Sequence, residues 1–108
     1  HIPSTIAVGD HTFLIEDSGI ASCLDTITGN ENWMERVPGV EGSIFGSPVS
    51  DGENLFFADE NGNLHVIAAS PEFEHVATNR LGELCRTTPV IVGGMIYIRT
   101  ESKLSAWK

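Results

Sequence analysis

Basic residues are scarce in this sequence, and their scarcity excludes whole classes of partner. The 108 residues include 6 Lys and Arg against 15 Asp and Glu, which gives a formal net charge of -9 at pH 7. A surface of this sign repels nucleic-acid phosphates and anionic lipid headgroups. We therefore expect no nucleic-acid partner and no attraction to an acidic membrane surface.

Long apolar runs and clustered cysteines are also missing. No hydrophobic stretch approaches the roughly 20 residues of a transmembrane helix, so membrane insertion is not expected. Cys23 and Cys85 are far apart in the chain, with no C-x-x-C or Cys/His spacing around either. This pair predicts neither a disulfide framework nor a zinc site. We expect Cys23 to be a buried, small hydrophobic residue.

The common signatures of catalysis and metal binding are absent as well. The sequence has no G-x-S-x-G, no phosphate-binding loop and no G-x-G-x-x-G. Its four histidines share no short metal-ligand spacing, so we expect them at the surface or at sheet edges. The most metal-like stretch is Asp59–Asn63, but an EF-hand calcium loop would need a glutamate where Ser70 stands. Asn61-Gly62 is better explained as the turn of a β-hairpin.

What the sequence does contain is a repeat of 41–43 residues. Residues 4–39 align with 47–82 at an offset of 43, and 88–93 align with 47–52 at an offset of 41. Matching positions in the first alignment are Gly9 and Gly52, Phe13 and Phe56, Gly19 and Gly62, Leu24 and Ile67, and Gly39 and Gly82. Such a period is typical of folds in which one supersecondary unit recurs.

Each repeat has the pattern of short strands separated by tight turns, without helical periodicity. The expected strands lie near 4–8, 11–16, 20–24, 32–37, 47–49, 55–58, 64–68, 73–77, 88–92, 95–99 and 103–107. Four short antiparallel strands in about 40 residues are typical of a β-propeller blade. We predict an all-β fold of antiparallel blades at 1–39, 40–82 and, incomplete, 83–108.

One stretch, Leu24–Trp33, carries the clearest hairpin signal. It reads L-D-T-I-T-G-N-E-N-W. Asp25 can accept backbone N–H groups as the chain turns, and Thr28-Gly29 supplies a position with positive φ. Trp33 then follows as a large apolar anchor, which we expect to pack between blades rather than against a ligand. The corresponding turn of the second repeat is degraded, because 69–73 read A-S-P-E-F.

These residues resemble the repeats of pyrroloquinoline-quinone (PQQ) type propellers. The pattern L-D-x-x-T-G-x-x-x-W at 24–33 resembles the tryptophan-docking motif of that family, and the S/T-P-V…G…F/Y elements from Ser47 and Thr88 resemble its paired repeats. The run 88–107 looks like the C-terminal blade of bacterial members. Some of these are similar to the outer-membrane assembly propeller lipoprotein, which binds no quinone.

The resemblance implies a partial propeller, because a closed ring has typically 4–8 blades. The chain would then be a C-terminal fragment, or several chains would assemble into a ring. The resemblance implies proteins or other propeller blades as partners, including further copies of the same chain. The main function that it implies is that of a scaffold or protein-binding platform in the periplasm or cell envelope. The alternatives are a fragment of a quinoprotein dehydrogenase with its catalytic residues in other blades, and the sensor domain of a signalling protein. Quinoprotein members use adjacent cysteines and calcium, which this sequence does not match, so neither PQQ nor calcium is expected.

One interaction site is predicted at the mouth of the propeller channel. Arg86, Thr87 and Thr88 precede the first strand of the third blade, and the hairpin turn that begins with Asp59 and Glu60 should open on the same propeller face. The segment 41–43 should lie there too. An arginine beside carboxylates can recognise a ligand or peptide, or it can form an ion pair that fixes the loops between blades.

Overall fold

A computed structural model of the chain describes residues 4–80, 90–92, 95–99 and 104–107. These residues form strands joined by turns, in three antiparallel sheets. The first sheet contains β1 (Ser4–Val8), β2 (His11–Ile15), β3 (Ile20–Asp25) and β4 (Glu31–Arg36). The second contains β5 (Ile44–Ser50), β6 (Asn54–Asp59), β7 (Asn63–Ala68) and β8 (His75–Arg80), and the third β9 (Val90–Val92), β10 (Met95–Arg99) and β11 (Leu104–Trp107). The described part of the chain has no helix that is long and apolar enough to cross a membrane.

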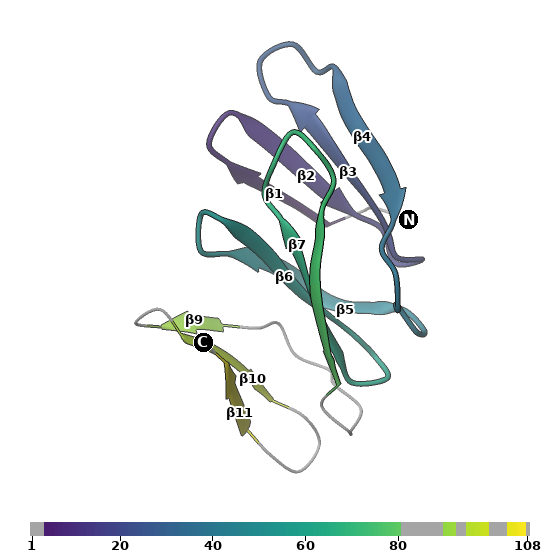
Figure 1. Ribbon diagram of the computed structural model, residues 1–108, viewed down its shortest axis with the longest axis vertical. Helices are drawn as coiled ribbons and strands as arrows, with labels where there is room; N and C mark the ends of the chain where they lie inside the picture. The colour runs from purple at the N-terminus through teal and green to yellow at the C-terminus, as the bar shows by residue number, and fades with distance from the viewer. Residues whose placement is uncertain (1–3, 81–89, 93–94, 100–103, 108) are drawn as a thin grey trace.

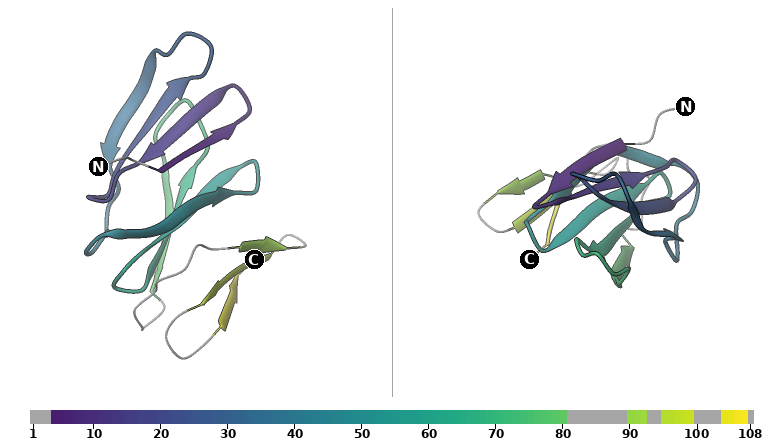
Figure 2. Two further views of the ribbon diagram at one scale, coloured as in Figure 1. Left: turned by 180° about the vertical axis from the view of Figure 1, so that it is seen from behind. Right: turned by 90° about the horizontal axis from the view of Figure 1, so that it is seen from above.

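The three sheets follow one another along the longest axis of the molecule (Figure 1). The view from behind in Figure 2 shows the same succession. Within each sheet the spatial order of the strands is their order in the chain, so each neighbouring pair is a hairpin. Between sheets, the first strands approach most closely, β1 beside β5 and β5 beside β9. Successive antiparallel sheets joined in this way are the arrangement of consecutive propeller blades, which confirms the predicted fold class.

The observed strands match the predicted ones to within a few residues, with two informative differences. β5 begins at Ile44 rather than near Ser47, because Ile44 is buried and pairs with Asp59. β8 begins at His75 rather than near Phe73, because Phe73 precedes the strand and packs against the apolar cluster between the first two sheets. Both differences arise from contacts with residues distant in the chain.

The turn between β3 and β4 forms as its sequence predicts. The Asp25 carboxylate accepts the backbone N–H groups of Ile27 at 3.0 Å and Thr28 at 2.9 Å. Gly29 has φ 77° and donates its own N–H to the Asp25 carbonyl at 2.8 Å. Glycine suits this position because L side chains rarely adopt a positive φ.

Two apolar clusters hold the sheets together. The cluster between the first and second sheets contains Phe13, Ile15, Ala21, Cys23, Trp33, Val37, Ile44, Leu55, Phe57 and Ile67. The cluster between the second and third sheets contains Phe56, Ala58, Leu64, Val66 and Ile96. The middle sheet is therefore packed on both faces, and this explains why the apolar run at 55–58 does not alternate with polar residues.

Candidate functional site

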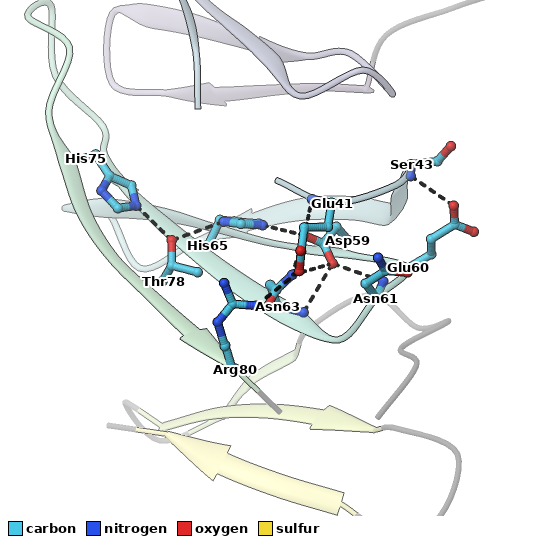
Figure 3. A network of polar contacts seen from close by, with 10 residues as sticks. All are labelled: Glu41, Ser43, Asp59, Glu60, Asn61, Asn63, His65, His75, Thr78 and Arg80. Atoms are coloured by element: carbon cyan, nitrogen blue, oxygen red, sulfur yellow. Dashed lines mark hydrogen bonds and ion pairs between the residues drawn. The ribbon is translucent and has the colours of Figure 1, made fainter. Parts of the chain in front are cut away.

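The structure places Asp59 and Glu60, two of the five residues of the predicted interaction site, in a polar network of the second sheet. Asp59 and Glu60 lie at the end of β6 and in the turn to β7, close to the linker 37–43 that joins β4 to β5. Segment 41–43, which was expected on the same propeller face as this turn, is joined to it by hydrogen bonds from Glu41 and Ser43. The segment 86–88 lies outside the described residues, so the approach of Arg86, Thr87 and Thr88 to this turn stays a prediction. Figure 3 shows the network.

The Asp59 carboxylate is fully buried and is the centre of the network (Figure 3). Its Oδ1 accepts the backbone N–H groups of Asn61 at 3.0 Å and Asn63 at 3.2 Å, and the Asn63 side-chain amide at 3.1 Å. Its Oδ2 accepts the backbone N–H of Glu41 at 2.9 Å, the same amide at 2.9 Å, and Nε2 of His65 at 2.7 Å. A carboxylate offers about four lone-pair positions, so donors within the protein fill this one.

The expectation that all four histidines lie at surfaces or edges is wrong for His65. Its side chain has 0% exposure, because β7 lies inside the middle sheet and the ring sits against Phe57 with 5.5 Å between centroids. While Nε2 contacts Asp59, Nδ1 lies 3.2 Å from Oγ1 of Thr78, and that hydroxyl lies 2.8 Å from Nε2 of His75. With Asp59 ionised and His65 neutral, one proton arrangement satisfies all three contacts: His75 donates to Thr78, Thr78 donates to His65, and His65 donates to Asp59.

The electrostatics agree with that proton arrangement. Burial raises the pKa of Asp59, but hydrogen bonds from the Glu41 backbone, His65 and Asn63 outweigh it and hold the pKa below its usual value. Burial lowers the pKa of His65, and the neighbouring Asp59 carboxylate offsets only part of this effect. Near neutral pH the pair is therefore an ionised carboxylate and a neutral imidazole.

The rim of the network ties the linker to β8. Arg80 Nη1 lies 3.0 Å from Glu41 Oε1 and donates to Asn63 Oδ1 at 3.0 Å, while the Asn63 amide donates to Glu41 at 2.9 Å. The Asn63 and Arg80 hydrogen bonds lower the pKa of Glu41. The Arg80 and Glu41 side chains are 68% and 49% exposed, so solvent screens this ion pair and it adds little stability by itself. On the other side of the linker, the Glu60 carboxylate accepts the Ser43 N–H at 3.1 Å.

The order of groups Thr78, His65 and Asp59 is that of a hydroxyl–imidazole–carboxylate triad. Unlike the groups of a catalytic triad, these groups are not accessible to a substrate. The side chains of His65 and Asp59 have 0% exposure, and the Thr78 hydroxyl is already bonded to two histidines. The contacts instead join the linker, the β6–β7 turn and β8. Among the described residues, no group of three or more His, Cys, Asp or Glu side chains is placed to hold a metal ion. The network therefore fixes the position of the linker on the second sheet.

The anchor residue Trp33 lies between the first and second sheets. Its indole Nε1 donates to the Ser70 carbonyl at 3.0 Å, and its ring meets Phe73 edge-on with 5.0 Å between centroids. Phe13 is a second aromatic neighbour, at 6.2 Å. Ser70 and Phe73 belong to the stretch 69–73, so the degraded turn of the second repeat receives the tryptophan of the first. The assignment of 24–33 to the PQQ family's docking motif stays a prediction.

Cys23 is a free, buried cysteine in the same cluster, as the sequence indicates. Its Sγ lies 3.6 Å from the Asn32 side-chain oxygen, and burial raises the pKa of the thiol. A thiol with a raised pKa is a poor nucleophile at neutral pH. Its place in the structure is that of a small core residue.

The sequence interpretation missed four members of the network, His65, His75, Thr78 and Arg80. A signal for three of them was present in the repeat alignment, where the offset of 43 pairs His65 with Ser22, Thr78 with Glu35, and Arg80 with Val37. Among the other residues of β7, Leu64, Val66 and Ile67 pair with the apolar residues Ala21, Cys23 and Leu24. A change of type at positions that share one sheet face indicates an interaction that belongs to this blade alone.

Comparisons with known proteins support the fold. No protein-family model and no curated protein sequence matches this chain at a significant level. Among solved structures, the chain is similar to BamB from Moraxella catarrhalis, with a TM-score of 0.73 and 21% sequence identity. The match covers 95% of this chain and 32% of the BamB chain, so the protein spans about a third of that structure's length. The likeness is one of fold: consecutive blades of a β-propeller.

Proposed function

We propose that the chain is a rigid β-propeller segment that serves as a protein-binding scaffold and has no catalytic role of its own. The observation that carries this proposal is the closed polar network around Asp59. Its carboxylate, its imidazole and its hydroxyl are the groups best suited to chemistry, and they are used to hold linker 37–43 on the second sheet. Fully satisfied buried networks of this kind stiffen a fold.

The acidic surface supports a protein rather than a nucleic acid as the partner. With a net charge of -9, the chain attracts basic protein surfaces and repels phosphates. In the part of the chain that the structure describes, β4 and β8 are the outer strands of their sheets, and each pairs with a neighbouring strand on one side only. An unpaired edge can accept an extended segment of another polypeptide as an additional strand.

The setting that we propose is the bacterial cell envelope, with outer-membrane protein assembly as the process. The likeness to BamB supports it, together with the resemblance of the repeats to bacterial PQQ-type propellers. The alternatives are a segment of a quinoprotein dehydrogenase and a sensor domain, and both make different predictions about ligands.

Site-specific photo-crosslinking tests this setting. The chain would be exported to the periplasm of a Gram-negative host with a photoreactive residue at Ile27, which is 86% exposed, or at Val76, which is 46% exposed. We expect adducts with outer-membrane assembly proteins or their β-barrel substrates. The control is the same labelled chain retained in the cytoplasm. If the exported chain gives no adduct above that control, the scaffold proposal fails.

Equilibrium dialysis against PQQ and Ca²⁺ tests the dehydrogenase alternative. Because this alternative places the catalytic residues in other blades, the dialysis is done on the full-length protein that contains this chain. Under the scaffold proposal, that protein retains no PQQ and reduces no electron-acceptor dye when an alcohol is added. Stoichiometric retention of PQQ with alcohol-dependent dye reduction would favour the quinoprotein alternative instead.

A further inference from the structure

We propose that linker 37–43 responds to acid: it stays on the second sheet while His65 is neutral and separates from that sheet when His65 binds a proton. His75, which is half-buried and is joined to His65 through Thr78, sets the pH at which this separation occurs. The inference goes beyond the proposed function, because it concerns the rigidity of the scaffold and does not depend on which partner the scaffold binds.

Linker 37–43 is fixed at both ends in the apolar cluster between the first two sheets. Val37 is buried at its start, and Ile44 is buried directly after its end. Between these ends, the Glu41 backbone N–H donates to the Asp59 carboxylate at 2.9 Å, so a polar contact holds the middle of the linker on the second sheet. Loss of that contact can move the middle of the linker while both ends stay in place.

The linker also covers the contact between His65 and Thr78. A Cβ atom at Gly39 would lie 3.6 Å from Oγ1 of Thr78 and 3.9 Å from Cε1 of His65, so the linker backbone passes over both side chains. His65 also packs against Phe57, and its side chain has 0% exposure, whereas Gly39 is exposed. The linker backbone is therefore a thin barrier between solvent and the His65 ring.

Thr78 joins His65 to a second histidine that lies nearer to solvent. Its Oγ1 is 3.2 Å from Nδ1 of His65 and 2.8 Å from Nε2 of His75, and Figure 3 shows the three side chains in a row that ends at Asp59. A hydroxyl has one hydrogen, so Thr78 can donate to only one of the two rings. A protonated imidazole can only donate, so a protonated His75 donates to Thr78 and leaves the Thr78 hydrogen for His65. With one proton on His75, every contact in this row is satisfied.

A second proton, bound by His65, conflicts with this arrangement. Both rings would then donate to Thr78, and the Thr78 hydrogen would have no acceptor, because in the described part of the chain this hydroxyl makes hydrogen bonds only to the two rings. Two cationic rings on one hydroxyl also repel each other. A proton on His75 therefore opposes a proton on His65 both through hydrogen bonding and through charge.

The other charged groups around His65 fix the direction of the response. Asp59 of β6 favours a protonated ring, whereas burial, His75 and Arg80 of β8 disfavour it, and the balance lowers the pKa of His65. The Glu41 carboxylate of the linker pairs with Arg80. When the linker separates from the sheet, water reaches the ring and the effect of burial on its pKa is relieved. The ring then binds a proton more readily, so a lower pH shifts the population toward the state with the linker separated.

Hydrogen–deuterium exchange, followed residue by residue with mass spectrometry, tests the proposal on the full-length protein that contains this chain. Exchange rates are corrected for their intrinsic dependence on pH. We expect the protection of the Glu41 N–H to fall at least about tenfold between about pH 7.5 and about pH 5, because a solvated imidazole with a pKa of about 6.5 is about 30-fold more protonated than neutral at the lower pH. The Val37 N–H, which donates to the Gly19 carbonyl at 2.9 Å, should keep its protection. Unchanged protection of Glu41, or an equal loss at Glu41 and Val37, would overturn the proposal.

Two variants, His65→Gln and His75→Gln, separate the roles of the two histidines. The amide introduced by His65→Gln can donate to Asp59 and accept from Thr78 as the neutral imidazole does, but it binds no proton in this pH range. This variant should keep the Glu41 N–H protected at about pH 5. His75→Gln removes the competing charge and supplies an oxygen that can accept from Thr78. It should raise the midpoint of the loss of protection by about half a pH unit, which is about a threefold gain in proton affinity.

The control is His11→Gln, the same change in β2 of the first sheet, which should leave the midpoint at its wild-type value. A purely structural role of His75 would lower the protection at every pH without moving the midpoint. That result, or a midpoint moved to lower pH, would refute the link through Thr78. If His65→Gln loses protection in acid as the wild type does, His65 is not the group that binds the proton and the proposal is wrong. Circular dichroism at each pH shows that every variant is folded before it is compared.

Discussion

Replacing Asp59 by asparagine should remove much of the stability of this protein while leaving the volume of the side chain unchanged. Each carboxylate oxygen accepts three donors, from Asn61 and Asn63 on one side and from Glu41, Asn63 and His65 on the other. Whichever way the asparagine amide is turned, its NH₂ group faces donors instead of accepting from them. Each buried donor left without a partner costs about 1–3 kcal/mol.

With two to three donors affected, we expect Asp59→Asn to lower the free energy of unfolding by about 3–5 kcal/mol, the range seen when one partner of a buried charged pair is removed. Domains of this size have about 5–15 kcal/mol in total. The measurement is urea denaturation at neutral pH, followed by tryptophan fluorescence and circular dichroism.

The control is Asp51→Asn, the same change in an exposed turn. The Asp51 Oδ1 accepts only the backbone N–H groups of Glu53 and Asn54, each at 2.9 Å, and asparagine keeps an oxygen for them. Asp51→Asn should therefore lower the free energy of unfolding several times less than Asp59→Asn does. Equal losses in the two variants would show that the network does not hold the linker, and the interpretation of the site would have to be abandoned.

Three other substitutions test the packing of Trp33, the titration of His65 and the close approach at Gly19. Trp33→Ala should lower the free energy of unfolding by about 3–5 kcal/mol, because it empties the space between the first two sheets. Trp33→Phe should lower it less. Equal losses for the two variants in urea denaturation would contradict this packing. The folded-state pKa of His65 lies below its unfolded value of about 6.5, so its contribution to stability is complete above that pH and is lost as the pH falls toward the folded value. His65→Gln should therefore reduce the loss of stability that denaturation curves show as the pH falls below about 6.5, and an unchanged pH dependence would exclude His65 as its source. Gly19→Ala should lower the melting temperature, because Gly19 has φ 92° and a Cβ there would lie 2.9 Å from Cγ1 of Val40. The control is Gly9→Ala, which introduces a side chain at a positive φ with open space around it and therefore causes backbone strain without a clash. If both variants lower the melting temperature equally, the clash with Val40 is ruled out.

The sequence by itself determined the strands, the turns and the repeating unit, because these depend on neighbours a few residues apart. Asp25 and Gly29 build their turn from local hydrogen bonds and a positive φ, and the glycine at 62 does the same between β6 and β7. The apolar run 55–58 indicated a strand buried on both faces, which it is. The large aromatic Trp33 could be assigned to the space between blades on the repeat pattern alone.

Only the tertiary structure decided what the candidate site does. Asp59 and Glu60 were found from the sequence, but a pattern of residue types cannot show that Asp59 receives donors from Glu41, 18 positions earlier, and from His65, 6 positions later. The burial of His65 likewise depends on residues distant in the chain, because its ring lies against Phe57 of β6 and contacts Thr78 of β8.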